Sequence, residues 1–189
     1  MNSFYALIFR QKYMRRWSMM RNVTEETLSE HSMECAVLAH ALAMIGNTYL
    51  GKQYDPARAA VVALNHDAPE VYTSDLPTPV KYFDEDMRKT YAKVEEYAVQ
   101  TLVGKLPEKL QQAYQNLLIP EDENVEKLVK TADKLCAYIK CLQELKSGNL
   151  EFKAAAQSTY NKLMEYQSEE LAFFIEHCLP SFEKNIDEL

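Results

Sequence analysis

One stretch of the chain joins a helix start to a pair of metal-binding side chains: Asp55-Pro56-Ala57-Arg58-Ala59-Ala60-Val61-Val62-Ala63-Leu64-Asn65-His66-Asp67. Asp55 is a good helix N-cap, and Pro56 suits the first helical position because its missing N–H would have had no partner there. The apolar run that follows predicts a buried helix with His66 and Asp67 at its inner end. Two polar side chains at a buried helix end cost stability unless a partner, such as a divalent metal ion, compensates them.

A second carboxylate follows this pair across a proline. Glu70 lies four residues after His66 and three after Asp67, which is one face if the backbone stays helical. Pro69 tends to end or kink a helix just before itself, so we expect a break that lets Glu70 start a new segment facing a substrate. The structural alternative is an exposed glutamate in the first turn of a helix, stabilised by the helix dipole.

Length and composition fit an ordinary globular protein. We expect the 189 residues, 1–189, to form a single domain. Apolar residues make up 47% of the chain and charged residues 26%, while only 4 glycines argue against a turn-rich β fold. The net charge of −7 disfavours a nucleic-acid polymer as partner, since its phosphate backbone is also negative. A single nucleotide is compatible with this charge, because its phosphate needs one local basic site.

The cysteines and the apolar runs bear on the compartment. Cys35, Cys136, Cys141 and Cys178 show no Cys-x-x-Cys spacing, so we expect buried free thiols in a reducing compartment. No apolar run reaches the ~18 residues of a membrane span, and the N-terminal apolar segment 4–9 is short for a signal peptide. The expectation is a cytoplasmic protein with no membrane partner.

Helical periodicity runs through nearly the whole chain, and we find no alternating strand pattern of useful length. The sequence therefore predicts an all-α, single-domain fold. Ser29 is the expected N-cap of the first long helix, which would end near Ile45 at Gly46-Asn47. The other predicted helices span 55–67, 86–103, a short stretch after Pro107, 123–146, 150–166 and 169–182. A loop with two prolines is expected over 73–79.

Asp133 is a carboxylate on or beside the apolar stripe of its own helix. Val129 and Cys136 flank it at helical spacing. A carboxylate in this position is usually paired with a base or bound to a metal. The alternatives are a salt bridge to Lys130 or Lys134, or simple exposure at the edge of the stripe.

The histidines divide by the side of the helix on which they lie. His31 falls in the first turn of its helix on the same side as Cys35, whereas His40 lies nine positions on. At about 100° per residue, His40 points to the opposite side. We expect His31 to face a site, with a hydrogen-bonded core histidine as its alternative. His40 and His177 are assigned to structure.

The order His31, His66-Asp67, Asp133 resembles the ligand signature of the HD-domain metal-dependent phosphohydrolases. The surrounding sequence is similar, more narrowly, to the bacterial HD-domain 5′-deoxynucleotidases. The segments that carry this resemblance are Arg15-Arg16-Trp17, Met20-Arg21-Asn22-Val23, Ser29-Glu30-His31-Ser32, His66-Asp67-Ala68-Pro69-Glu70, Asp75-Leu76-Pro77-Thr78-Pro79-Val80-Lys81-Tyr82, Lys130-Thr131-Ala132-Asp133, Cys136-Ala137-Tyr138 and Pro180-Ser181-Phe182. The resemblance spans almost the whole chain, and it implies the HD-domain fold and a homodimer.

The resemblance implies that His31, His66, Asp67 and Asp133 bind one divalent transition metal ion. Two imidazoles and two carboxylates suit such an ion better than Mg²⁺, which prefers oxygen ligands alone. We expect Co²⁺ or Mn²⁺, with Zn²⁺, Fe²⁺ or Cu²⁺ as alternatives.

The resemblance also implies the residues that bind substrate: Arg16, Trp17, His31, Asp67, Asp75, Leu76, Pro77, Thr78 and Asp133. Arg16 would clamp the phosphate with its guanidinium, and Trp17 would help to exclude a ribose 2′-hydroxyl. Without the resemblance, Arg16 reads as solvated charge, Trp17 as core packing, and the segment 75–78 as turn chemistry. The residues expected to act in catalysis are Glu70, Arg16 and Asp67, with Glu70 orienting the attacking water or transferring a proton.

The function implied is a metal-dependent 5′-deoxynucleotidase, which hydrolyses deoxyribonucleoside 5′-monophosphates to deoxyribonucleosides and inorganic phosphate. Two alternatives stay open. One is an HD-domain phosphohydrolase acting on a triphosphate, a cyclic dinucleotide or an alarmone. The other is a helical, non-enzymatic binding protein whose His and Asp side chains are structural.

Overall fold

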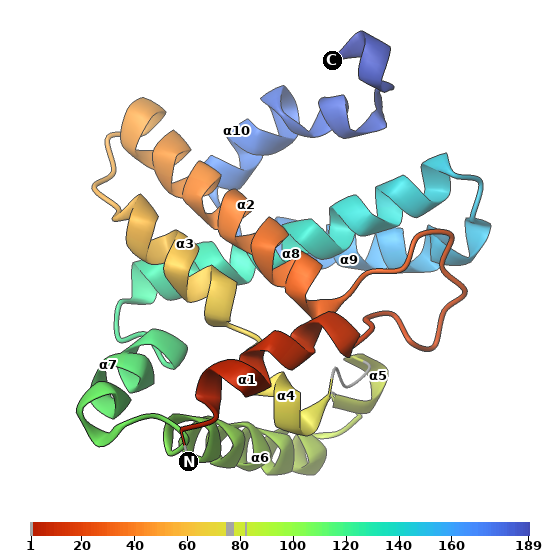
Figure 1. The fold of residues 1–189 in the computed structure, drawn as a ribbon. Helices are drawn as coiled ribbons and strands as arrows, with labels where there is room; N and C mark the ends of the chain where they lie inside the picture. The colour runs from red at the N-terminus through yellow and green to blue at the C-terminus, as the bar shows by residue number, and fades with distance from the viewer. Residues whose placement is uncertain (1, 75–77, 82) are drawn as a thin grey trace.

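The computed structural model describes residues 2–74, 78–81 and 83–189 (Figure 1). These ranges contain helices and one isolated antiparallel bridge between Arg15 and Thr27, which confirms the predicted all-α class. In chain order the elements are α1 (Phe4–Ile8), the 3₁₀ helix η1 (Phe9–Tyr13), α2 (Leu28–Tyr49), α3 (Pro56–Asn65), α4 (Glu70–Thr73), α5 (Thr78–Lys81), α6 (Glu85–Val103), α7 (Glu108–Leu118), α8 (Glu123–Lys146), η2 (Leu150–Phe152), α9 (Lys153–Glu165), α10 (Glu169–His177), η3 (Leu179–Glu183) and η4 (Ile186–Glu188).

Helix α2 begins and ends at residues other than those predicted. Its N-cap is Thr27 rather than Ser29: the Thr27 hydroxyl accepts the N–H of Glu30, whose carboxylate accepts the N–H of Thr27. The helix continues through Gly46, where the sequence suggested an end. A Cβ at Gly46 would lie 2.5 Å from the Tyr54 ring, so this glycine permits close packing instead of stopping the helix.

Other boundaries follow the prediction in part. The predicted loop 73–79 is too long at both ends, because α4 includes Thr73 and α5 begins at Thr78. The Asp55 carboxylate caps α3 by accepting the N–H of Arg58 at 2.9 Å, and α8 spans the predicted residues 123–146. The predicted helix 169–182 is interrupted at Cys178, because Pro180 cannot continue an α-helix and the chain turns into η3. The predicted helix 150–166 starts with a 3₁₀ turn before α9.

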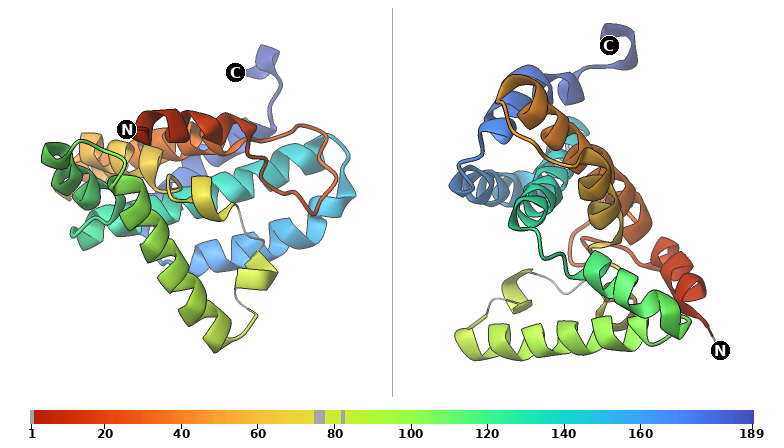
Figure 2. Two further views of the ribbon diagram at one scale, coloured as in Figure 1. Left: turned by 60° about the horizontal axis from the view of Figure 1, so that its bottom comes forward. Right: turned by 90° about the vertical axis from the view of Figure 1, so that its left-hand side faces the viewer.

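Helices α2, α3 and α8 cross at the centre of the molecule and enclose the main core (Figure 1). Leu42 of α2 and Leu135 of α8 are fully buried there, and Leu163 and Leu171 close the core from α9 and α10. Figure 2 shows α6 lying along the side of the molecule remote from α10. None of the helices within the described ranges is both long enough and apolar enough to cross a membrane.

The segment 14–27 connects η1 to α2 and folds back along the start of that helix. The N–H of Arg16 donates to the Glu26 carbonyl at 3.0 Å, and the N–H of Leu28 donates to the Met14 carbonyl at 2.8 Å. Two parts of one loop are therefore held side by side. This pairing places Arg16 and Trp17 next to the first turn of α2.

A buried ion pair of α8 anchors the far end of this segment. Glu144 is 2% exposed and accepts the backbone N–H groups of Val23 and Thr24, at 2.9 and 3.1 Å. Lys140 and Asn149 donate to the same carboxylate. Burial opposes the charge of Glu144, but these hydrogen bonds outweigh it and lower its pKa to about 2.

Candidate metal centre

The four predicted metal ligands converge from α2, from the end of α3 and from α8. Nε2 of His31 lies 3.2 Å from Asp133 Oδ1 and 3.4 Å from Asp67 Oδ2. Nε2 of His66 lies 3.1 Å from Asp67 Oδ1. Ligand atoms that share one transition-metal ion are about 3.0–3.5 Å apart, since each bond to the ion measures roughly 2.0–2.2 Å. The observed spacings fall within this range, with the two imidazoles approaching different oxygens of Asp67.

The hydrogen bonds around His66 leave one ring nitrogen available. Its Nδ1 lies 2.6 Å from the carbonyl of Ala63, which can only accept, so Nδ1 donates to this carbonyl and Nε2 is the ring nitrogen that faces the other ligands. Among the described residues, neither His66 Nε2 nor Asp67 Oδ2 has a hydrogen-bond partner, although both atoms are buried. A cation bound between them would compensate both atoms.

The electrostatics at His31 also favour positive charge. Burial and the nearby Arg16 oppose protonation of this fully buried ring, but Asp133 and Glu26 outweigh them and raise the pKa of His31 to about 10. His31 in turn holds the pKa of Asp133 well below its ordinary range, against the desolvation of that carboxyl group. The carboxylates around His31 therefore favour a positive charge at this position.

Cys35 lies one helical turn after His31, at the floor of the site. Its Sγ is 3.4 Å from His31 Nε2 and 3.4 Å from Cys136 Sγ. With His31, His66 and Asp133 it forms a group whose ligand atoms all lie within 4.8 Å of one another. Burial and the neighbouring Cys136 thiol raise the pKa of the Cys35 thiol far above its ordinary value.

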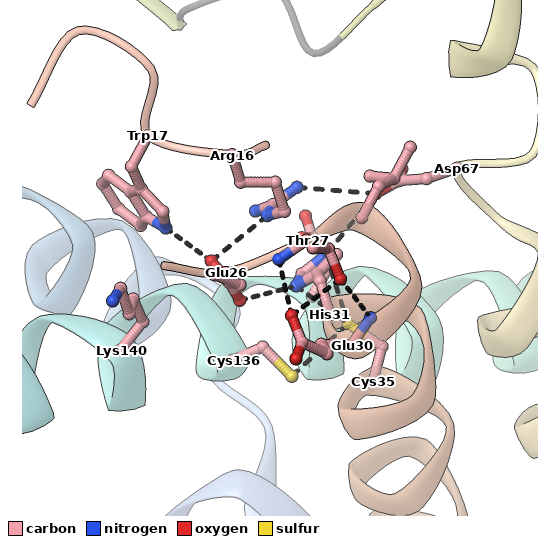
Figure 3. Close-up of polar contacts among 12 residues, drawn as sticks. Arg16, Trp17, Glu26, Thr27, Glu30, His31, Cys35, Asp67, Cys136 and Lys140 are labelled. Atoms are coloured by element: carbon pink, nitrogen blue, oxygen red, sulfur yellow. Dashed lines mark hydrogen bonds and ion pairs between the residues drawn. The ribbon is translucent and has the colours of Figure 1, made fainter. Parts of the chain in front are cut away.

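Arg16 lies beside the predicted ligand Asp67, and Trp17 adjoins Arg16 and contacts Glu26 (Figure 3). The Arg16 side chain is 12% exposed, with Nη1 3.5 Å from Asp67 Oδ2, so it is not the solvated charge of the alternative interpretation. The Trp17 ring packs against Phe152 at 5.3 Å between centroids. Its backbone has φ +57°, in the left-handed region that side-chain-bearing residues rarely adopt.

Glu26 is the functional candidate that the sequence reasoning missed. The segment that contains it is polar in composition, yet Glu26 is 7% exposed and faces His31, Arg16 and Trp17. The capping box of α2 was the available signal. It fixes Thr27 as N-cap, and so places Glu26 directly before the helix, within reach of the first turn.

Glu70 begins α4, with Pro69 in the N-cap position, as the break at the proline predicts. The Glu70 side chain shares the wall of a cavity of about 340 Å³ with His66 and Asp67. Residues of α6 and α7 form the opposite wall. The cavity is large enough to place a small molecule next to two of the predicted ligands.

A second hollow, of about 440 Å³, lies between residues 21–23 and residues 147–151. Its described lining contains none of the predicted ligands. It marks the place where two loops meet, stabilised by the hydrogen bond from Asn149 to the Arg21 carbonyl. The candidate chemistry therefore belongs to the smaller cavity.

Four predicted substrate contacts were placed on the proline-rich segment. Asp75, Leu76 and Pro77 lie outside the described residues, and Thr78 is described as the first residue of α5. Their contacts with sugar and phosphate stay predictions.

The residues assigned to structure lie away from the site. His40 is exposed on the opposite side of α2, and His177 is half-exposed at the end of α10, against the ring of Phe173. The proposed salt bridge from Lys130 to Asp133 is not formed, since Lys130 pairs with Glu126 at 2.5 Å. The assignment of His31 and Asp133 as metal ligands stays a prediction.

The family model described as YfbR-like 5′-deoxynucleotidase matches residues 3–182. The chain belongs to this family. A 5′-deoxynucleotidase of Vibrio cholerae is 43% identical over 188 residues, which cover 98% of this chain and 97% of that protein. The 5′-deoxynucleotidase YfbR of Escherichia coli is 44% identical over 188 residues, covering 98% and 94%.

Solved structures share the fold of this YfbR-like chain. An HD-domain phosphohydrolase of Listeria innocua has a TM-score of 0.84 at 21% identity, covering 95% of this chain and 88% of that one. The HD phosphohydrolase DatZ of cyanophage S-2L, bound to dA and one catalytic Zn²⁺, has a TM-score of 0.66 at 16% identity, covering 93% and 96%. These likenesses confirm the HD-domain fold predicted from the sequence.

Proposed function

We propose that this chain is a 5′-deoxynucleotidase, which hydrolyses deoxyribonucleoside 5′-monophosphates to deoxyribonucleosides and inorganic phosphate. The observation that carries the proposal is the convergence of His31, His66, Asp67 and Asp133, with the Arg16 guanidinium 3.5 Å from Asp67. The names of the Vibrio cholerae and Escherichia coli relatives support this activity, and the dA bound to DatZ supports a deoxynucleoside as the organic part of the substrate.

The four converging side chains would hold one divalent transition metal ion. Co²⁺ or Mn²⁺ is proposed on the basis of the mixed nitrogen and oxygen donors, and the Zn²⁺ of DatZ supports zinc as an alternative. When bound, such an ion polarises the phosphate and lowers the pKa of a water molecule, which makes a nucleophile available at neutral pH.

The chain itself supplies phosphate binding and water orientation. Arg16 would bind two phosphate oxygens and neutralise the charge that develops as the phosphate ester breaks. Asp67 faces Arg16 as well as both imidazoles. It would therefore hold the Arg16 guanidinium at a fixed position relative to the metal ligands. Glu70, on the cavity wall, would accept a hydrogen bond from the attacking water or take up its proton.

Selection of deoxyribose is assigned to Trp17. Trp17 adjoins the phosphate clamp, and a large rigid ring there would leave no room for a 2′-hydroxyl. Asp75 and Thr78 would bind the sugar hydroxyl and the phosphate, and Leu76 and Pro77 would contribute to the same substrate-binding segment.

A monophosphate suits the charge of the cavity better than a longer phosphate chain. Lys81 is the basic residue among the described cavity walls, and its ammonium pairs with Glu95 at 2.6 Å. A triphosphate or an alarmone would need several more cationic side chains than this cavity offers.

The experiment that tests the function is phosphate release from dAMP, dGMP, dCMP and dTMP and from the matching ribonucleotides, with Co²⁺ or Mn²⁺ added. Release from the deoxynucleotides at a rate well above that from the ribonucleotides is expected. Equal rates would defeat the deoxyribose preference, and no release from any monophosphate would defeat the nucleotidase.

The assembly and the location are also proposals. We propose a homodimer in the cytoplasm, supported by the family resemblance, by exposed aromatic side chains such as Phe9 and Tyr97 at 71% and 70%, and by four free cysteines. Sedimentation equilibrium at micromolar concentration should give twice the mass of the chain. A mass of one chain would overturn the dimer.

A further inference from the structure

Glu26 sits at the junction of three groups to which the proposed function gives different tasks (Figure 3). Its Oε2 accepts the indole N–H of Trp17 at 2.7 Å and lies 3.5 Å from Nε of Arg16. Its Oε1 lies 3.6 Å from Nδ1 of His31. One buried carboxylate thus faces a metal ligand, the phosphate clamp and the sugar-selecting ring.

The backbone fixes Glu26 as firmly as its side chain. Its carbonyl accepts the N–H of Arg16 at 3.0 Å, and the next residue, Thr27, is the N-cap of α2. Glu26 is therefore held in place by two elements. One is the segment that carries Arg16 and Trp17, and the other is helix α2, which carries His31. A change in the Glu26 side chain therefore acts directly on His31, Arg16 and Trp17.

We propose that Glu26 is a positioning residue, which couples metal binding at His31 to the placement of Arg16 and Trp17. The roles of Arg16 and Trp17 in this proposal rest on the proposed function. The effect of Glu26 on metal binding at His31 rests on the geometry.

The coupling has a separate physical basis at each partner. A carboxylate facing Nδ1 of a histidine fixes the ring so that Nε2 faces the metal, and it makes that nitrogen a better donor. At Trp17 the hydrogen bond from the indole holds a residue whose backbone, at φ +57°, is otherwise strained. At Arg16 the negative charge restrains a flexible guanidinium before substrate arrives, which reduces the entropy lost on binding.

The test compares three variants. Glu26→Gln keeps the size of the side chain and one carbonyl oxygen for the Trp17 indole, but it removes the charge. Glu26→Ala removes every contact. Glu25→Gln is the matched control, because Glu25 is the adjacent residue, is exposed, and pairs only with the exposed Arg15 among the ion pairs of the described residues.

The affinity for Co²⁺ is measured by isothermal titration calorimetry of the metal-free proteins. Folding is checked by circular dichroism. We expect Glu26→Gln to bind Co²⁺ about 10- to 100-fold more weakly, as is typical when the carboxylate behind a ligating histidine is lost. At saturating Co²⁺, Glu26→Gln should keep part of the deoxy-to-ribo ratio of kcat/KM, whereas Glu26→Ala should lose most of it. Glu25→Gln should match the wild type in both measurements.

Wild-type Co²⁺ affinity in a folded Glu26→Gln would overturn the proposal, and so would an unchanged deoxy-to-ribo ratio in a folded Glu26→Ala. If Glu26→Ala fails to fold, the isosteric Glu26→Gln still decides the metal-binding half. If the wild type releases no phosphate from any deoxynucleotide while Glu26→Gln still binds Co²⁺ more weakly, the proposed function fails and the positioning of His31 stands.

Discussion

Replacing Glu144 with glutamine should destabilise the protein strongly, although Glu144 lies outside the metal centre. The substitution keeps the size of the side chain and removes its charge. It leaves the Lys140 ammonium, with 7% of its side chain exposed, without the carboxylate 2.5 Å away. It also weakens the acceptors for the N–H groups of Val23 and Thr24.

The pKa of Glu144 gives the size of the effect. Its folded value of about 2, against an ordinary value of 4.5, corresponds to about 3 kcal/mol of stability at neutral pH. Removing one partner of a buried ion pair typically costs about 3–5 kcal/mol, which agrees with this figure. For a chain of this size the loss corresponds to a fall in Tm of roughly 6–12 °C.

The sign of the pH dependence follows from the lowered pKa. The stabilisation by Glu144 is fully present above pH 4.5 and is lost as the pH falls towards about 2. The difference in unfolding free energy between wild type and Glu144→Gln should therefore be about 3 kcal/mol at pH 7 and less than half of that at pH 3.

The assay is urea unfolding followed by circular dichroism, for wild type and variant at both pH values. Glu126→Gln is the control, because Glu126 pairs with Lys130 on the same helix but its side chain is 46% exposed. Its cost should stay below ~1 kcal/mol at either pH. A loss below 1 kcal/mol for Glu144→Gln at pH 7, or a loss that does not change with pH, would refute the reasoning.

Three further predictions concern the site and its scaffold. Asp133→Ala should lose its bound transition metal while the protein stays helical. Elemental analysis measures the metal content and circular dichroism the helicity. A metal content equal to that of the wild type would show that Asp133 is not a ligand. Trp17→Ala should lower the ratio of kcat/KM for deoxynucleotides to kcat/KM for ribonucleotides. An unchanged ratio would show that the Trp17 ring does not select the sugar. Gly46→Ala should destabilise the protein by about 1–3 kcal/mol in urea unfolding, since the new Cβ would lie 2.5 Å from the Tyr54 ring, whose hydroxyl is tied to Glu170 at 2.8 Å. Equal or greater stability of this variant would show that the ring moves aside freely.

Local signals gave the parts of the fold that could be predicted. The Asp55-Pro56 pair marked the start of α3, because capping depends on residues adjacent in sequence. The end of α2 was mispredicted because the role of Gly46 depends on Tyr54, which reaches it only after the chain has turned back. Helix propensity alone carries no information on that contact.

The same distinction holds within the site. The choice of His31 over His40 follows from helix geometry, and the structure places His31, not His40, beside Asp133. Glu26 could not be chosen in this way. Its importance arises from the pairing of 14–17 with 26–28 and from the burial of a carboxylate in a segment whose composition resembles an exposed loop.

The left-handed backbone of Trp17 has a free-energy cost that the contacts of its side chain must offset. Such a conformation costs a residue with a side chain about 1–2 kcal/mol, and glycine would relieve the cost. Glycine would also delete the ring proposed to recognise the sugar. It would also remove the packing of the ring against Phe152 and the indole hydrogen bond to Glu26, so contacts of the side chain hold a tryptophan in a backbone conformation that by itself favours glycine.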